Sequence, residues 1–353
     1  MKDKKCQYEN LNLLKCICMF LIVLWHCIIH GNVLGNIENS YLNIIINVIL
    51  FLIIVHVNCF IMITGFFQYK SKVKVKKIIE YYIQVVFYCL TIYLIDSLIT
   101  NSKISMKLIL YNISPFAIKK YWFMYCYLML YIFSDYLNII IQKISKSSFE
   151  KGLLLMFIVF SIFPFIFFER VVENNGFTTI HFIFLYFIGA YLSMYPLKKQ
   201  IGKTNYMKKI LLIFLGCFAI NFVINYITDV YYYSEFKSTI AYNISSKLII
   251  TKYSYARPLV ILQSIAFFEI FNNLNVSFKF SRFTQYLLGI YLISENELIR
   301  PHLYKYLTPI NLKINSFSFL IKLIIYSELI FTICFIIEFL RKKIFLLFEK
   351  KIS

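Results

Sequence analysis

NLNLLKCICMFLIVLWHCIIHG, at residues 10–31, is the first long apolar run of the chain and decides its fold. It is long enough to cross a bilayer, for which about 20 apolar residues suffice. Each residue of an α-helix advances about 100°, so Lys15 and His26 return to within about 20° of one another. Asn12 and His30 fall about 60° away on the same side. Because ionisable groups inside a membrane are costly, this polar stripe predicts a functional site, with Lys15 and His26 about 16 Å apart along the helix.

The composition extends this reading to the whole chain. The sequence is 60% hydrophobic and only 15% charged, and its mean hydropathy is +0.71. These values predict an all-α, polytopic integral membrane protein whose partner is the lipid bilayer. The formal net charge of +20 would suggest nucleic acid in a soluble protein, but here it fits cytoplasmic loops rich in Lys and Arg, so no nucleic-acid partner is expected.

Apolar runs recur along the chain and predict about ten transmembrane helices. They lie at about 11–30, 41–68, 78–99, 121–142, 152–168, 178–195, 209–228, 258–274, 283–299 and 317–340. The stretch 101–120 reads as a loop or interfacial segment, and 229–257 as a long Tyr- and Ser-rich loop.

The loop charges orient these helices. With the N-terminus in the cytoplasm, the basic head 1–9, the basic segment 70–77 and the basic tail 341–353 all fall on the cytoplasmic side. Both termini are then cytoplasmic, and ten spans are self-consistent. The tail is also amphipathic, which suits the membrane surface. We expect a single membrane domain over residues 1–353.

His26 has two readings. A buried histidine can simply bond to a neighbouring helix, or it can take a proton from a hydroxyl, since its pKa lies near neutrality. Lys15 likewise either snorkels to the cytoplasmic interface or meets an anion there. HCIIH, at residues 26–30, has the spacing of a metal pair, but it lacks the Glu of an HExxH motif, so no metal is expected.

Two further segments carry candidate groups. YWFMYCYLMLY, at residues 121–131, contains Trp122 and Tyr125, and forms either an interfacial aromatic belt or a stacking surface for sugars. Glu295 closes the ninth predicted helix on the outer side, at the depth of His26, where it can orient an imidazole.

Six motifs, taken in order, resemble the membrane acyltransferases of family 3, bacterial O-acetyltransferases of cell-surface sugars. Lys15 and His26 match a basic residue, ten others and a histidine in the first helix, with Lys for the commoner Arg and Asn12 for the commoner Asp. Ser294 stands where a His is usual, and Glu295 matches. The remaining matches are NCFIMITGFF at 58–67, Lys74 with Lys76 and Lys77, YWFMYCYLMLYIFSDYLN at 121–138 and FIFLYFIGAYLSMY at 182–195.

The resemblance implies transfer of an acetyl or other short acyl group from cytoplasmic acyl-CoA to a hydroxyl of a polysaccharide or its lipid-linked precursor, in the bacterial cytoplasmic membrane. Acetyl-CoA is then a donor substrate, and no cofactor is bound permanently. His26 is implied as general base or acyl carrier, assisted by Glu295. The CoA phosphates are implied to meet Lys15, Lys74 and Lys77. We expect Asn12, Trp122 and Tyr125 to support the acceptor, together with His30, to which the resemblance assigns no role.

Two other functions use similar features. A flippase for lipid-linked sugars would also need a polar stripe and aromatic helices, and a polysaccharide polymerase would be expected to carry a large, arginine-rich outer loop. The sequence leaves a homo-oligomer open.

Overall fold

The computed structural model describes residues 2–167, 174–198, 205–233, 240–307, 314 and 316–352. Within these ranges the chain forms helices joined by turns and loops, and its only extended pairing is an isolated bridge between Ile37 and Ile314. The predicted all-α class is therefore confirmed for the described residues.

Seven candidate spans are long and apolar enough to cross a membrane, counted over the described residues, so the protein is a multi-pass membrane protein. They are α1 (Lys2–His30), α3 (Ser40–Ile53) with α4 (His56–Gln68), α5 (Val75–Ile99), α7 (Trp122–Lys143), α8 (Lys146–Phe157) with η1 (Ile158–Ile162) and α9 (Phe163–Phe167), α12 (Tyr206–Tyr232) and α18 (Ser318–Ile352). Two shorter apolar helices are α10 (Thr179–Met194) and α14 (Pro258–Asn272).

The segment predicted as the ninth span, 283–299, is broken. It contains α15 (Ser281–Thr284) and α16 (Leu287–Ser294), and α17 (Arg300–Lys305) follows. The apolar run LLGIYLIS is only eight residues long. Beyond it, the Asn296 side chain accepts from the Leu298 amide and holds a turn. The count of ten spans is therefore not confirmed, and the cytoplasmic placement of both termini stays a prediction.

Two predicted loops contain helices. α6 (Met106–Ile113) lies in the stretch predicted to be interfacial. α13 (Ile240–Leu248) and the 3₁₀ turn η3 (Ile249–Thr251) lie in the predicted long loop. The remaining short elements are α2 (Val33–Asn36) and η2 (Asn174–Gly176). The basic tail continues α18 without a break as far as Ile352.

The chain divides into two compact units, each discontinuous in sequence. The first unit contains residues 1–18, 47–73 and 126–278, and the second contains residues 19–46, 74–125 and 279–353. The expectation of a single domain is not tested by this division.

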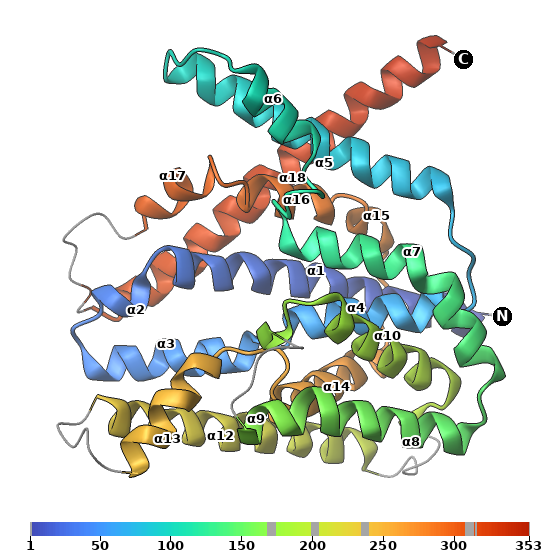
Figure 1. Cartoon of the computed structure of the whole chain (residues 1–353), viewed down its shortest axis with the longest axis vertical. Coiled ribbons are helices and arrows are strands. Elements are labelled where there is room, and N and C mark those ends of the chain that lie inside the picture. The colour runs from blue at the N-terminus through green and yellow to red at the C-terminus, as the bar shows by residue number, and fades with distance from the viewer. Residues whose placement is uncertain are drawn as a thin grey trace. The chain divides into compact units, whose positions relative to one another are not determined.

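In the first unit, α4 and α10 pack closely against each other (Figure 1). Gly65 of α4 faces the Tyr186 backbone, and a Cβ at Gly65 would lie 2.1 Å from that carbonyl oxygen. Gly189 of α10 faces the Met62 carbonyl oxygen in the same way, at 2.0 Å. These two glycines therefore allow the two backbones to approach, as small residues do in membrane helix pairs.

In the second unit, α18 packs against α16, which also contacts α5. The buried Glu338 of α18 accepts hydrogen bonds from Tyr88 and Gln84 of α5. Arg341 completes the group with two bonds of 2.7 Å to the same carboxylate. A buried charge that is paired and hydrogen-bonded in this way fixes one helix against another.

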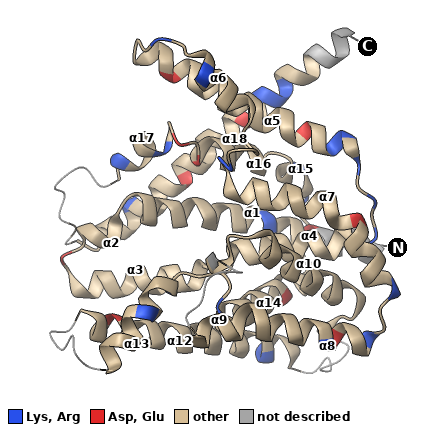
Figure 2. Cartoon of the chain, viewed as in Figure 1, with Lys and Arg blue, Asp and Glu red and all other residues tan. Residues whose placement is uncertain are grey.

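Charged side chains are sparse along the helices. Figure 2 shows Lys and Arg on the segment that joins α4 to α5 and on the C-terminal part of α18. Both places belong to the predicted cytoplasmic side, and this distribution is the one expected of membrane helices linked by basic cytoplasmic segments.

Candidate active site

The site begins at the end of α1. His26 and His30 are four residues apart, so they project from the same side of the helix. Their ring centroids lie 5.1 Å apart, with an angle of 33° between the ring planes. The two imidazoles therefore form one polar surface in the second unit. His30 lies beside His26 on the same side of the helix, as the polar stripe on this segment predicts.

Glu295 faces both histidines. It is the first residue after α16, where the helix ends. Its Oε1 lies 2.9 Å from His26 Nδ1, and its Oε2 lies 3.3 Å from His30 Nε2. The Glu295 side chain is 10% exposed, against 14% for His26 and 27% for His30. The pair with His26 is an electrostatic contact at hydrogen-bond distance, although Nδ1 is not aligned for a hydrogen bond in this conformation.

Two residues that the sequence does not predict, Tyr304 and Arg300, also contact the Glu295 carboxylate. Tyr304 Oη donates to Glu295 Oε1 at 3.4 Å, and Arg300 Nη1 lies 3.9 Å from Oε2. The Tyr304 ring also lies 5.5 Å from the His30 ring. Arg300 and Tyr304 are four residues apart in α17, a spacing that places them on one face, but nothing in the sequence connects that face to Glu295.

The electrostatics of the site keep Glu295 ionised. Burial alone raises the pKa of this carboxyl, but the charges of His26 and His30 and the polar contacts that they make with it outweigh burial and bring its pKa below the ordinary value of 4.5. Glu295 is thus a carboxylate at neutral pH.

The turn that carries Glu295 is fixed from the segment before α7. Tyr121 Oη donates to the Leu292 carbonyl at 2.9 Å and accepts from Asn296 Nδ2 at 2.9 Å. Lys120 Nζ, in turn, lies 2.9 Å from Glu297 Oε1. These contacts hold the residues on both sides of Glu295, so its side chain keeps its place beside the histidines.

The same three side chains have the donors of a metal site. The ligand atoms of His26, His30 and Glu295 all lie within 4.8 Å of one another. Two imidazoles and one carboxylate form a familiar set of zinc ligands. The third ligand, which HCIIH lacks, is here supplied from far along the sequence. The absence of a required metal remains a prediction, tested below.

The predicted donor-binding residues are on separate elements. Lys15 Nζ lies over the Phe67 ring, 5.3 Å from its centroid, and Asn12 is half-buried; both residues belong to the first unit. Lys74 is exposed immediately before α5, and Lys77 lies over the Tyr81 ring at 5.5 Å; both belong to the second unit. Their contact with CoA stays a prediction.

The predicted acceptor-binding aromatic residues start α7. Trp122 packs edge to face with Phe123, and Tyr125 lies beneath the Lys119 ammonium at 5.1 Å. Both side chains are half-buried. The structure thus places them near the segment that fixes the Glu295 turn, while their contact with a sugar remains untested.

Comparison with known proteins gives one match. A family model described as an acyltransferase domain, of the third acyltransferase family, matches residues 8–339. No curated protein matches the chain. No solved structure matches it either. The family match covers the His26 and Glu295 segments and both predicted donor-binding segments.

Proposed function

Because the chain belongs to the acyltransferase 3 family and is a membrane acyltransferase, we propose that it transfers an acetyl or other short acyl group from cytoplasmic acyl-CoA to a hydroxyl of a cell-surface polysaccharide or its lipid-linked precursor. The observation that supports this reaction best is the Glu295 carboxylate between two imidazoles. The bacterial cytoplasmic membrane is the proposed location, because donor and acceptor then meet it from opposite sides.

His26 is the proposed general base. With Glu295 beside Nδ1, the imidazole favours the tautomer with its proton on Nδ1, which leaves the lone pair of Nε2 for a substrate. The acceptor hydroxyl oxygen attacks the thioester carbonyl carbon while its proton moves to Nε2. The carbon–sulfur bond then breaks, and the CoA thiolate leaves with the proton from Nε2. Glu295 stabilises the imidazolium that exists between these two transfers.

His30, Arg300 and Tyr304 act on Glu295 rather than on substrate in this proposal. Each places a donor or a positive group near one of the carboxylate oxygens. They hold the carboxylate toward His26 and limit the freedom of its side chain. We regard them as positioning residues.

The donor is held by basic groups on the cytoplasmic side. Lys15, Lys74 and Lys77 are the proposed contacts of the CoA phosphates, since ammonium groups bind phosphate as point charges. Asn12, Trp122 and Tyr125 are proposed to support the acceptor. Export or polymerisation of lipid-linked sugars without acyl chemistry is set aside, because the family is one of acyltransferases.

The test uses the purified full chain in detergent with acetyl-CoA and a glycan acceptor. Release of free CoA thiol and gain of one acetyl mass on the glycan are expected together, and only when both substrates are present. His26→Ala should lose both signals, whereas His302→Gln, which changes an exposed histidine on α17, should retain them. Normal acetylation by His26→Ala would overturn the mechanism.

A further inference from the structure

Arg257 is a buried cation without a counter-ion in the described part of the first unit. The residue is 3% exposed and directly precedes α14. Burial is the sole cause acting on its pKa, which falls to about 10, so the guanidinium stays charged at neutral pH. Leaving a charge buried without an opposite charge costs several kcal/mol. The fold keeps this arrangement, which therefore requires an explanation.

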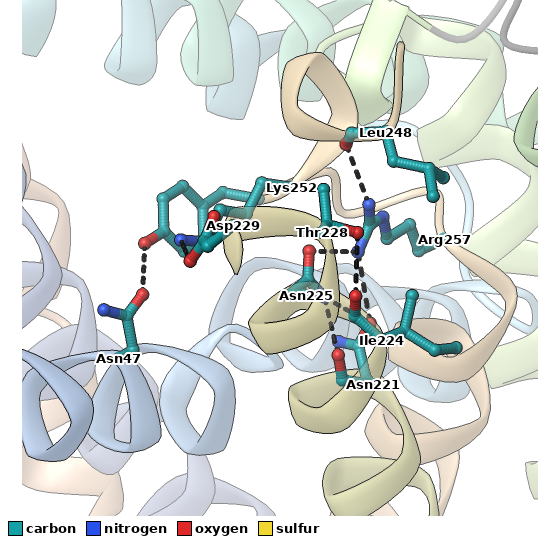
Figure 3. Close-up of polar contacts among 10 residues, drawn as sticks. Asn47, Asn221, Ile224, Asn225, Thr228, Asp229, Leu248, Lys252 and Arg257 are labelled. Atoms are coloured by element: carbon teal, nitrogen blue, oxygen red, sulfur yellow. Dashed lines mark hydrogen bonds and ion pairs between the residues drawn. The ribbon is translucent and has the colours of Figure 1, made fainter. Parts of the chain in front are cut away.

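Neutral groups take up four of the guanidinium donors, and Figure 3 draws the bonds to Asn221, Asn225 and Leu248. Nη1 donates to Asn225 Oδ1 at 2.7 Å and to Asn221 Oδ1 at 3.3 Å. Nη2 donates to the Leu248 carbonyl at 3.1 Å and to Thr251 Oγ1 at 3.2 Å. Part of this pattern is structural, since Leu248 ends α13 and an arginine there caps the helix. A helix end carries only about half a negative charge, however, which does not balance the cation.

The nearest acidic residue in Figure 3 is already engaged. Asp229 lies one turn beyond Asn225 on α12, and its Oδ2 is 2.6 Å from Lys252 Nζ. The charges of Asp229 and Lys252 therefore balance each other. The cluster as a whole thus keeps one unbalanced positive charge, and it is carried by Arg257.

Two buried hydrogen-bond donors indicate that the cluster has a place for an acceptor. Among the described residues, neither Arg257 Nε nor Asn221 Nδ2 has a hydrogen-bond partner, and Asn221 is 2% exposed. Buried polar groups are nearly always paired, so orphan donors beside a cation indicate a place for an acceptor. The Phe165 ring covers the guanidinium face at 5.5 Å, which leaves the Nε edge for that acceptor.

The segment that carries Arg257 is held rigidly. Asn58 Nδ2 donates to the Tyr255 carbonyl at 2.9 Å, and Ser161 Oγ donates to the Ala256 carbonyl at 2.6 Å. The Tyr255 amide donates to the Asn175 carbonyl at 3.0 Å. Ser161 belongs to the π-helical turn η1, a feature often found at functional sites. The backbone before Arg257 is thus fixed, and the guanidinium is held in one place instead of moving out to solvent.

The position of Arg257 and its partners beside α13 indicates which kind of ligand they bind. α13 exposes Ile240 and Ile244 and buries Ser245, as an interfacial helix does. With the N-terminus cytoplasmic and the short helix α10 crossing the membrane, as the sequence predicts, the segment after α12 lies on the outer side, where an interfacial helix meets lipid phosphates. We propose that Arg257 and Asn221 bind a phosphate oxyanion there, from an outer-leaflet lipid headgroup or from the phosphate of a lipid-linked glycan. This binding site goes beyond acyl transfer and does not depend on it.

The test measures thermal unfolding of the full chain in two arms. One arm adds inorganic diphosphate to the protein in a non-ionic detergent, and the other adds either phosphatidylglycerol or a glycolipid without phosphate to the protein in the same detergent. Bound ligand raises the Tm in proportion to the logarithm of its concentration above Kd. The wild type should gain Tm in at least one arm, and the arm that responds identifies the source of the phosphate.

Three variants make the result specific. Arg257→Gln should lose the response, and Arg282→Gln, which removes an exposed arginine from α15, should keep it. If Arg257→Gln does not fold, Asn221→Asp decides, because it has the same shape and places a carboxylate beside Nη1. It should raise the Tm without ligand and abolish the response. No response of the wild type in either arm, or an unchanged response in Arg257→Gln or Asn221→Asp, would overturn the proposal.

Discussion

His26 Nδ1 lies 2.9 Å from Glu295 Oε1, although His26 lies four residues before the end of the first span and Glu295 directly follows the short helix α16, far along the chain. Neither side chain alone has the properties of a general base that this contact provides. A histidine beside a carboxylate gains a defined tautomer and a stabilised imidazolium, and these are the properties that a general base requires.

The first prediction concerns the base. His26→Gln retains a polar side chain of similar reach but cannot take the proton, so we expect kcat to fall by about 10²–10⁴-fold, the usual contribution of general acid–base catalysis. The measurement is the rate of CoA release at saturating donor and acceptor. A KM for acetyl-CoA near that of the wild type would place the loss in the chemical step. A kcat within threefold of the wild type would refute the role.

A second prediction concerns pH. Glu295 lies outside the seven candidate spans, and its pKa is lowered in the folded protein. A lowered pKa contributes stability that is present above the unfolded value of 4.5 and is lost as the pH falls toward the folded value. The Tm of the wild type should therefore drop below pH 4.5 more steeply than that of Glu295→Gln. Parallel curves for the two proteins would contradict the ion pair.

The third prediction tests the contact of α4 with α10. Gly65→Ala places a methyl group against the Tyr186 backbone, which cannot rotate away, so we expect a loss of about 1–3 kcal/mol or more. Gly216→Ala is the matched control on α12. Its Cβ would meet nothing within 4 Å, and the change should stabilise the helix by about 1 kcal/mol. Thermal unfolding of both variants separates packing from helix propensity, and equal effects would show that the close contact is not needed.

A fourth prediction concerns metal. The ligand atoms of His26, His30 and Glu295 lie close enough to hold an ion, yet the proposed reaction needs the His26 lone pair for a proton. Extensive dialysis against a chelator should therefore leave the rate of CoA release unchanged, and added Zn²⁺ should inhibit by occupying the histidines. Activity that disappears on dialysis and returns with metal would replace the proposed base with a metal-bound group.

The sequence predicts much of this fold because the signals are local. The apolar run at residues 10–31 becomes α1, and the polar stripe on it contains the two histidines of the site. Glu295 was predicted from its place at the end of an apolar run, and from a resemblance to known enzymes. The place of the histidines follows from helix geometry and spacing alone, whereas the role of Glu295 also depends on the resemblance.

What the sequence does not predict depends on contacts between distant segments. The broken helix at 283–299 ends where the Asn296 side chain holds a turn, which no apolar pattern reveals. Arg300 and Tyr304 join the site only because α17 follows that turn. Arg257 likewise appears as an ordinary loop cation until its partners on α12 are known.

The Glu338 cluster has a practical consequence for where this protein can be cut. The family match ends at residue 339, but the bidentate partner of Glu338 is Arg341. A truncation that follows the family boundary would leave a carboxylate buried among α5, α16 and α18 with its cation removed, at a cost of about 3–5 kcal/mol. The working unit for expression therefore extends past Arg341.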